Sequence, residues 1–146
     1  MAELAVDGLS DLIRDLDALA EETPGICGEM LAAQADVVEP ALRRSLSAHG
    51  LVRTGRLQQS IARKKGKSKG GQAIRIGPRG EHHRYYPKTG SGVVSAGYVG
   101  YIHEYGLPSR GIRASKWVTK TVSESRDKAM DAAEQVYEQK LRKYNL

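Results

Sequence analysis

Apolar residues recur at a helical period near both ends of the chain, and this feature constrains the fold more than any other. Over residues 3–22 the apolar stripe is Leu9, Leu12, Ile13, Leu16, Leu19 and Ala20. Over residues 115–143 the stripe is Val118, Val122, Ser125, Ala129, Ala132 and Val136. Spacings of three and four place such residues on one face of an α-helix. The sequence therefore predicts an amphipathic helix at each end of the chain.

A second N-terminal helix is expected over residues 25–48, because the segment Thr23-Pro24-Gly25 interrupts the first. Its apolar stripe is Ile26, Met30, Ala33, Val37, Ala41 and Leu42. Pro40 predicts a kink or a break near Glu39, and His49-Gly50 predicts the end of the helix. The two helices would form a helical hairpin, or one of them would dock on another copy of the chain.

Residues 53–61, with the sequence RTGRLQQSI, predict a short helix. Thr54 is a suitable N-cap, since its side-chain oxygen can accept a bond from an early backbone N–H group. Leu57 and Ile61 are four residues apart and would share one face of the helix. This short helix would lead directly into a strand.

The segment up to Pro78 then predicts a β-hairpin with a basic, glycine-rich tip at residues 66–71. Pro78 would end the second strand because proline cannot donate to the ladder. Residues 79–97 have no periodicity and many turn formers, which predicts a long loop with a short strand at residues 93–94.

These elements predict a single α+β domain over residues 1–146. N-terminal helices and a long C-terminal helix would pack around a small antiparallel sheet with an extended hairpin. The expected regions are a helical part (1–50), a part with the sheet, hairpin and loop (51–112), and the C-terminal helix (113–146).

Charge is distributed unevenly along the chain, whose net charge is +6. Ten acidic residues and one basic residue precede Pro40, whereas residues 40–79 contain eleven basic residues and no acidic one. The imbalance fits nucleic-acid binding by the basic part, or contact between the acidic part of one copy and the basic part of the next. A merely solvated surface is the plain alternative.

Two charged sets would form such surfaces. The basic set, which would face a neighbouring subunit or DNA, is Arg63, Lys64, Lys65, Lys67 and Lys69. The acidic set, which would lie at a subunit interface, is Asp11, Asp15 and Asp17. Tyr85 and Tyr86 beside Arg84 would stack on bases if the basic part bound nucleic acid. No known nucleic-acid-binding motif accompanies them.

Motifs for catalysis and metal binding fail on spacing. His103-Glu104 begins a zinc-protease motif, but Leu107 stands where the second histidine belongs. Gly66-Lys67-Ser68 resembles the end of a phosphate-binding loop whose first glycine is missing. Adjacent His82 and His83 point to opposite faces of an extended segment. We therefore expect no catalytic residue, no metal and no cofactor.

Cys27 and the N-terminus bear on where the protein resides. A single cysteine excludes an internal disulfide and suits a reducing compartment, and Cys27 next to Ile26 is interpreted as a small core residue. The N-terminus is acidic and amphipathic, unlike a secretory signal, and no apolar run is long enough to span a membrane. We expect a protein made in the cytoplasm and not associated with membranes.

Three motifs resemble a family of tailed-phage proteins. The first consists of Thr54, Gly55, Leu57, Ser60 and Ile61. The second consists of Tyr98, Tyr101, Glu104, Tyr105 and Gly106, and the third of Ala114, Trp117 and Val118. In this order they are similar to the neck or tail-completion proteins of the lambdoid gene-product-ten type, over roughly residues 53–141. Departures from the family pattern are Leu107 for a threonine, Arg113 and Lys116 for prolines, and Tyr105 and Trp117 for phenylalanines.

The residues themselves favour an architectural role for the second and third motifs. Glu104, followed by Gly106 and Pro108, is interpreted as a sharp corner before the last helix. Its carboxylate would accept backbone N–H bonds there, or pair with an arginine, namely Arg56, Arg110 or Arg113. Trp117 and Val118 would anchor the last helix on the sheet.

The resemblance implies a structural virion protein and no enzyme. Copies would form a ring at the head–tail junction, a hexamer or alternatively a dodecamer, that joins the head connector to the tail. Its implied partners are head-closure or adaptor proteins and the tail terminator, and DNA would pass through the channel without sequence-specific binding. Two alternatives remain open: a small basic nucleic-acid-binding protein that uses residues 63–86, and a hydrolase built around His103 and Glu104.

Overall fold

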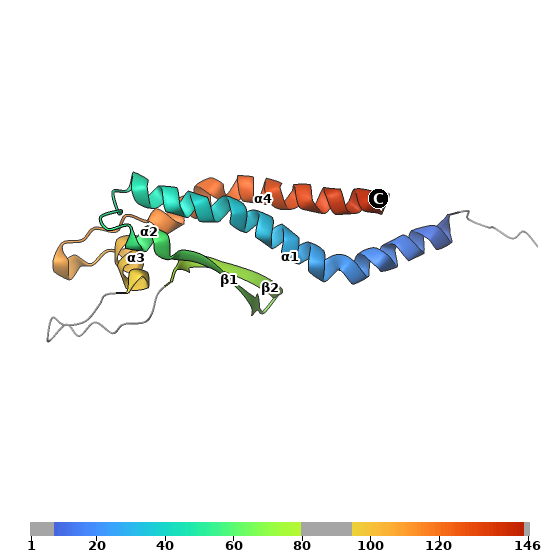
Figure 1. The fold of residues 1–146 in the computed structure, drawn as a ribbon, viewed down its shortest axis with the longest axis horizontal. Helices are drawn as coiled ribbons and strands as arrows, with labels where there is room; N and C mark the ends of the chain where they lie inside the picture. Colours follow the sequence, from blue (N-terminus) through green and yellow to red (C-terminus); the bar gives the residue numbers. More distant parts are fainter. Residues whose placement is uncertain (1–7, 80–94, 145–146) are drawn as a thin grey trace, which may run out of the picture.

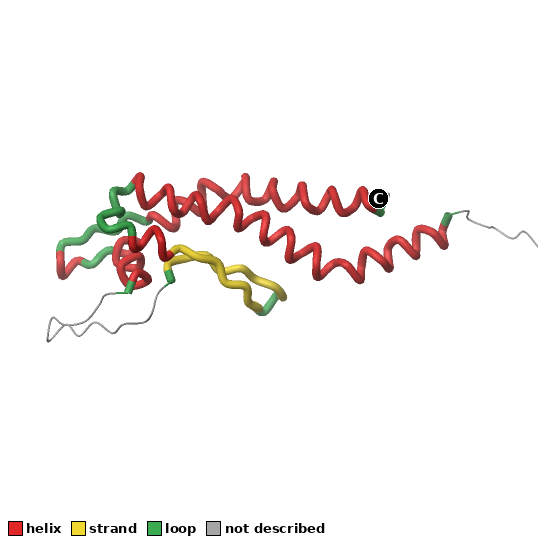
Figure 2. The backbone as a smooth tube through the Cα atoms, viewed as in Figure 1, coloured by secondary structure: helices red, strands yellow, loops and turns green. Residues whose placement is uncertain are grey.

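The computed structural model describes residues 8–79 and 95–144, and confirms the α+β class (Figure 1). The helices are α1 (Leu9–Ala48), α2 (Arg56–Ser60), α3 (Ala96–Tyr105), the 3-10 turn η1 (Pro108–Arg110) and α4 (Trp117–Lys143). The strands β1 (Ile61–Ser68) and β2 (Gly71–Pro78) form one antiparallel hairpin. Figure 2 shows the two long helices side by side, with the hairpin and the short elements on one side of them. The strand expected at residues 93–94 lies outside the described residues.

A single helix, α1, replaces the two N-terminal helices that were predicted. It runs through Pro24 and Pro40 and ends at Ala48, with His49 as its C-cap as expected. The prediction of a break was wrong because contacts on both sides of Pro24 hold the helix together: Glu22 pairs with Lys143 of α4, and Ile26 is buried. The Thr23 hydroxyl also donates to the Leu19 carbonyl at 2.9 Å, a bond that often accompanies a bend. Figure 1 shows the N-terminal part of α1 turning away from the rest.

The helix α4 packs antiparallel along α1 and confirms the predicted C-terminal helix. Its buried stripe follows a spacing of four and consists of Trp117, Thr121, Ser125, Ala129 and Ala133. The predicted stripe was therefore partly wrong, and Val122 is 49% exposed. Small side chains allow the helices to approach closely, and the Thr121 and Ser125 hydroxyls are satisfied by backbone carbonyls of their own helix.

The core lies at the end of the helix pair where α1, α2, β1 and α4 meet. It consists of Leu42, Leu46, Leu57, Ile61 and Trp117. Trp117 is 1% exposed, and its indole N–H donates to the Gly100 carbonyl of α3 at 3.1 Å. Leu57 and Ile61 thus share one buried face, as their spacing predicted.

The β1–β2 hairpin lies along α1 with one face toward the helix. Arg63 of β1 reaches Asp36 and Glu39 of α1, and the Gln72 amide of β2 donates to the Pro24 carbonyl at 2.7 Å. Because side chains alternate along a strand, these residues define the inner face of the hairpin. Gly28 provides space there, since a Cβ on it would lie 3.1 Å from the Gln72 side chain.

The first half of α1 is poorly covered, and one expectation about it was wrong. The stripe of Leu9, Leu12, Ile13 and Leu16 is between 44% and 51% exposed, because neither α4 nor the hairpin extends alongside it. Cys27 is exposed rather than part of the core, since it lies about 100° around the helix from buried Ile26.

One matched pair of leucines tests where the core lies. Leu46→Ala should lower the free energy of unfolding by about 2–5 kcal/mol, because Leu46 is fully buried and its removal leaves a cavity. Leu12→Ala, the same change at an exposed position, should stay within about 0.5 kcal/mol in the monomer. Urea unfolding followed by circular dichroism measures both, and equal losses would contradict this assignment of the core.

Candidate functional site

The first turn of α4 is capped by a side chain from another helix. Glu104 of α3 is only 5% exposed, and its carboxylate accepts bonds from the backbone N–H groups of Val118 at 2.7 Å and Thr119 at 3.3 Å. The Thr119 hydroxyl donates to the same carboxylate. Because Lys116, at the N-cap position, provides no side-chain cap, Glu104 satisfies N–H groups that would otherwise lack partners. Its negative charge also suits the positive end of the helix dipole.

These bonds control the protonation of Glu104. Burial acts to raise the pKa of its carboxyl group. The hydrogen bonds from Thr119 and Val118, together with the nearby Lys116 charge, outweigh burial and lower the pKa below 4.5. The carboxylate is therefore ionised at neutral pH and fully engaged as a cap. This is the backbone-binding role expected for it, although the N–H groups belong to α4 and not to the preceding corner.

Gly106 and Ser115 fix the connection between α3 and α4. Gly106 has a φ of 82°, and a Cβ there would lie 2.9 Å from the Ala114 nitrogen, so the position requires glycine. The Ser115 backbone N–H and hydroxyl both donate to the His103 carbonyl, at 2.8 and 2.7 Å. The second and third sequence motifs thus meet at one junction.

The helix α3 itself was missed, since residues 79–97 were expected to form a loop and 104–108 a corner. The sequence does contain its boundaries. The Ser95 hydroxyl accepts the Tyr98 N–H at 3.1 Å as an N-cap, and Gly106 follows the last helical residue. Serine at the start and glycine just past the end are standard helix signals. Two glycines and several aromatic residues in between obscured them.

The first motif forms the turn from α2 into the hairpin. Gly55, with a φ of 71°, takes the N-cap position in place of the predicted Thr54, because the chain enters α2 in a left-handed conformation. The Ser60 hydroxyl donates to the Leu57 carbonyl at 2.7 Å, and the Ser60 carbonyl accepts the Arg79 N–H at 2.7 Å. Glycine, leucine and serine therefore each have a distinct structural role in this motif.

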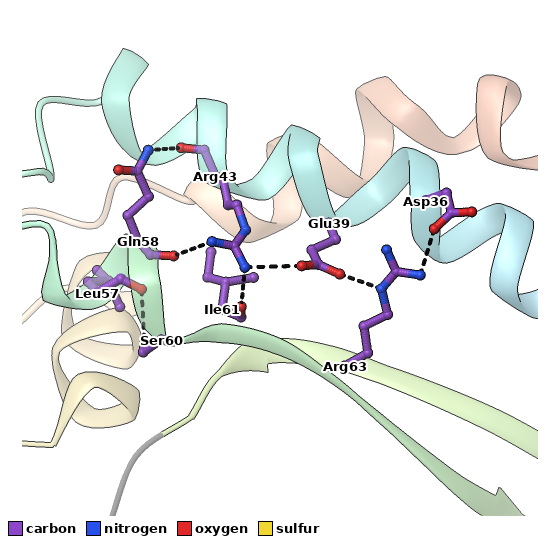
Figure 3. A network of polar contacts seen from close by, with 8 residues as sticks. All are labelled: Asp36, Glu39, Arg43, Leu57, Gln58, Ser60, Ile61 and Arg63. Carbon is purple, nitrogen blue, oxygen red and sulfur yellow. Dashed lines mark hydrogen bonds and ion pairs between the residues drawn. The ribbon is translucent and has the colours of Figure 1, made fainter.

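A polar network joins α1 to α2 and β1 (Figure 3). Arg43 of α1 donates to the Ile61 carbonyl at 2.6 Å and to the Glu39 carboxylate at 3.0 Å. Arg63 of β1 donates to the other oxygen of Glu39 and to Asp36 at 2.6 Å. The hydrogen bond from Arg63 is the main reason that the pKa of Glu39 is lowered, so this carboxylate also remains charged.

This network corrects the interpretation of the basic set. Arg63, although partly exposed, is bound to Asp36 and Glu39 of α1 within its own chain. The remaining members, Lys64, Lys65, Lys67 and Lys69, are exposed on the hairpin. Of the acidic set, Asp11 and Asp17 are exposed and Asp15 is half-buried, all on the N-terminal part of α1. The structure does not bring the two sets together within one chain.

An aromatic face on α3 was not predicted as a surface. Tyr98, Tyr101 and Tyr105 are between 45% and 60% exposed. The rings of Tyr101 and Tyr105 lie 4.8 Å apart, and the Lys116 ammonium lies 4.9 Å from the Tyr105 ring centre. Their spacing of three and four along the sequence is the signal that would have grouped them.

The remaining candidates for chemistry stay apart or fall outside the structure. His103 is half-buried and lines a hollow with Arg53 and Leu57, whereas Glu104 is bound to α4, so the two do not form a catalytic pair. His82, His83, Arg84, Tyr85 and Tyr86 lie outside the described residues. Within residues 8–79 and 95–144, no group of three or more potential ligands is placed to hold a metal. No helix in these ranges is long and apolar enough to cross a membrane.

A comparison with protein families finds one match. The family model described as "Bacteriophage HK97-gp10, putative tail-component" matches residues 10–102, which is more than half of the chain. The match includes most of α1, which the resemblance by motifs did not cover, and ends before Glu104. No curated protein and no solved structure matches the chain.

The cap provided by Glu104 gives a pH-dependent prediction. Glu104→Gln should lower the free energy of unfolding by about 1–3 kcal/mol at pH 7, since charge-assisted bonds to α4 are lost. Because folding lowers the pKa of Glu104, its contribution is complete well above pH 4.5 and disappears as the pH falls through the folded-state pKa. The difference from the unmodified protein should therefore shrink below pH 4.5.

Urea titrations at several pH values measure this difference. Glu134→Gln, which removes the same charge from an exposed position of α4, is the matched control and should have little effect. A Glu104→Gln difference that is unchanged down to pH 3 would contradict the role of the ionised carboxylate.

Proposed function

We propose, from the premise that this chain belongs to the HK97-gp10-like family of bacteriophage tail components, that its copies form a ring at the head–tail junction. The family identifies a structural protein of the phage tail, and hence of the virion. The ring and its position in the neck are our proposal. A hexamer is the expected assembly, with a dodecamer as the alternative.

The observation that carries the proposal is the family match together with an incomplete fold. The chain buries its apolar residues well at one end of the α1–α4 pair, but α1 continues past the end of α4 with four large apolar residues exposed. An isolated helical segment of this length is marginally stable in water. Such a segment is typical of a protein that completes its structure by contact with other subunits.

The proposed ring has two sets of partners. One of its faces would contact head-closure or adaptor proteins, and the other would contact the tail terminator. The aromatic face of α3 (Tyr98, Tyr101 and Tyr105) is a suitable contact surface, because exposed tyrosines are enriched where proteins bind each other. DNA would pass through the channel of the ring without sequence-specific binding, and no cofactor would take part.

Deletion of the gene tests the proposed position. Without this protein, infected cells should accumulate filled heads and separate tails, because the two halves cannot join. Electron microscopy counts these particles, and supply of the unmodified gene in trans should restore joined virions. Immunogold labelling should place the protein at the neck. Joined virions in its absence, or label elsewhere along the tail, would contradict the proposal.

A nucleic-acid-binding function is the second candidate, and the exposed lysines of the hairpin favour it. If it is correct, nuclease-treated protein should bind DNA with an affinity that falls at least tenfold between 50 and 200 mM salt, since each neutralised phosphate releases a counterion. Joint replacement of Lys64, Lys65, Lys67 and Lys69 by glutamine should abolish binding. Fluorescence anisotropy measures it, and Arg63→Gln is not a suitable variant because Arg63 stabilises the fold.

A further inference from the structure

Residues 9–21 form an arm whose apolar stripe is left uncovered by the rest of the described chain. The helix α1 is about 60 Å long and α4 about 40 Å, and the excess length lies at the N-terminal end of α1 (Figure 1). Toward this end the two helices are joined by the ion pair of Glu22 with Lys143 at 3.1 Å. Beyond it, the arm exposes Leu9, Leu12, Ile13 and Leu16.

Acidic side chains border the apolar stripe of the arm on both sides. At 100° per residue, Asp11 and Asp15 lie on one side of the stripe, and Asp17 and Glu21 lie on the other. The only basic residue of the arm, Arg14, is shared between Asp11 at 3.2 Å and Asp15 at 3.8 Å. A partner for the arm must therefore offer a surface that a helix can approach closely, with basic groups nearby.

The outer face of the β1–β2 hairpin, turned away from α1, has these properties. Three of its four cross-strand pairs are Ala62 with Gly77, Lys64 with Arg75, and Gly66 with Ala73. The two pairs of small residues make this face flat, so a helix can lie on it. Lys64, Arg75 and Arg79 line an open hollow at its base. Within the described residues, these three side chains have no acidic partner.

The pairing of Lys64 with Arg75 indicates that the outer face needs an anionic partner. The two residues are directly opposite each other across the strands, and like charges in that position destabilise a sheet. By contrast, Arg63 on the inner face is neutralised by Asp36 and Glu39. A negatively charged helix on the outer face would remove the repulsion in the same way.

We infer that the arm of one copy docks on the outer hairpin face of the next copy in the ring. The four carboxylates of the arm would surround Lys64, Arg75 and Arg79, while its leucines would cover the small residues between them. The other exposed apolar strip, Val122, Met130 and Tyr137 of α4, is a poorer site, because the charge of Arg126 within it is offset by Asp127 and Glu134 beside it.

The contact is heterologous, since the arm and the outer face are different surfaces of one chain. Repetition of such a contact from copy to copy produces a ring or a filament. The inference rests on the proposed ring and specifies its subunit interface.

Mixing two defective variants tests the contact. Leu12→Asp with Leu16→Asp disables the arm but leaves the outer face intact, and Lys64→Glu with Arg75→Glu disables the face but leaves the arm intact. Each variant alone should be monomeric, because each lacks one half of every contact. An equimolar mixture should form a dimer and nothing larger, since one working arm meets one working face. Analytical ultracentrifugation measures the masses, and circular dichroism verifies folding.

The matched control is Lys120→Glu with Arg126→Glu, which makes the same charge change on the exposed side of α4. This variant should assemble like the unmodified chain. Cross-linking extends the test to weak association: in a Cys27→Ser background, chains with Leu16→Cys and chains with Ala73→Cys should form a mixed disulfide under mild oxidation. Chains with Val122→Cys in place of Ala73→Cys should not.

Three outcomes would overturn the inference. These are a mixture that stays monomeric and gives no mixed disulfide above the Val122→Cys control, single variants that assemble normally, or a face variant that loses DNA binding while its self-association is unchanged. The last result would assign the outer face to DNA. None of them bears on the position of the protein in the virion, which immunogold labelling tests separately.

Discussion

The bond network between Glu104 and the first turn of α4 is the interaction on which the rest of the structure depends. The helix α4 begins at a left-handed lysine without a cap of its own, so its start is defined by a carboxylate from α3. Trp117, in the same turn, fills the space between α1, α2 and β1 and donates to Gly100 of α3. One turn of helix therefore joins most of the elements of the fold, and the position of α4 along α1 follows from it.

Opposite charges in this chain are used in two different ways. Toward the core, Asp36 and Glu39 of α1 bind Arg63, and toward the far end Glu22 and Glu29 bind Lys143 and Lys140. These pairs attach the hairpin and α4 to α1. The arm carries an excess of negative charge, and the outer hairpin face carries an excess of positive charge. A chain whose charges are paired internally at one end and remain in excess on two other surfaces is suited to repeated contact between copies.

The residues that could take part in chemistry have structural roles in the described part of the chain. Glu104, the one buried carboxylate among the described residues, is occupied by three hydrogen bonds to α4, and His103 lines a hollow with Arg53 and Leu57. The conspicuous residues of the motifs are accounted for by turns, caps and packing: Gly55 and Gly106 by positive φ, Ser60 by a turn, and Trp117 by the core. A structural tail component of a phage, as the family indicates, needs no more than this.

Local sequence determined the helices at both ends, the hairpin, and the buried pair Leu57 and Ile61, because periodicity, glycine and proline act over a few residues. It also contained the boundaries of α3, in Ser95 and Gly106, although the glycines between them obscured that helix. Three features depended on tertiary contacts. Pro24 does not break α1, because α4 and the hairpin hold both sides of it. Arg63 attaches the hairpin to α1, because β1 places it opposite Glu39. The first apolar stripe of α1 stays exposed, because α4 ends before reaching it, and periodicity reveals which face of a helix is apolar but not what covers that face.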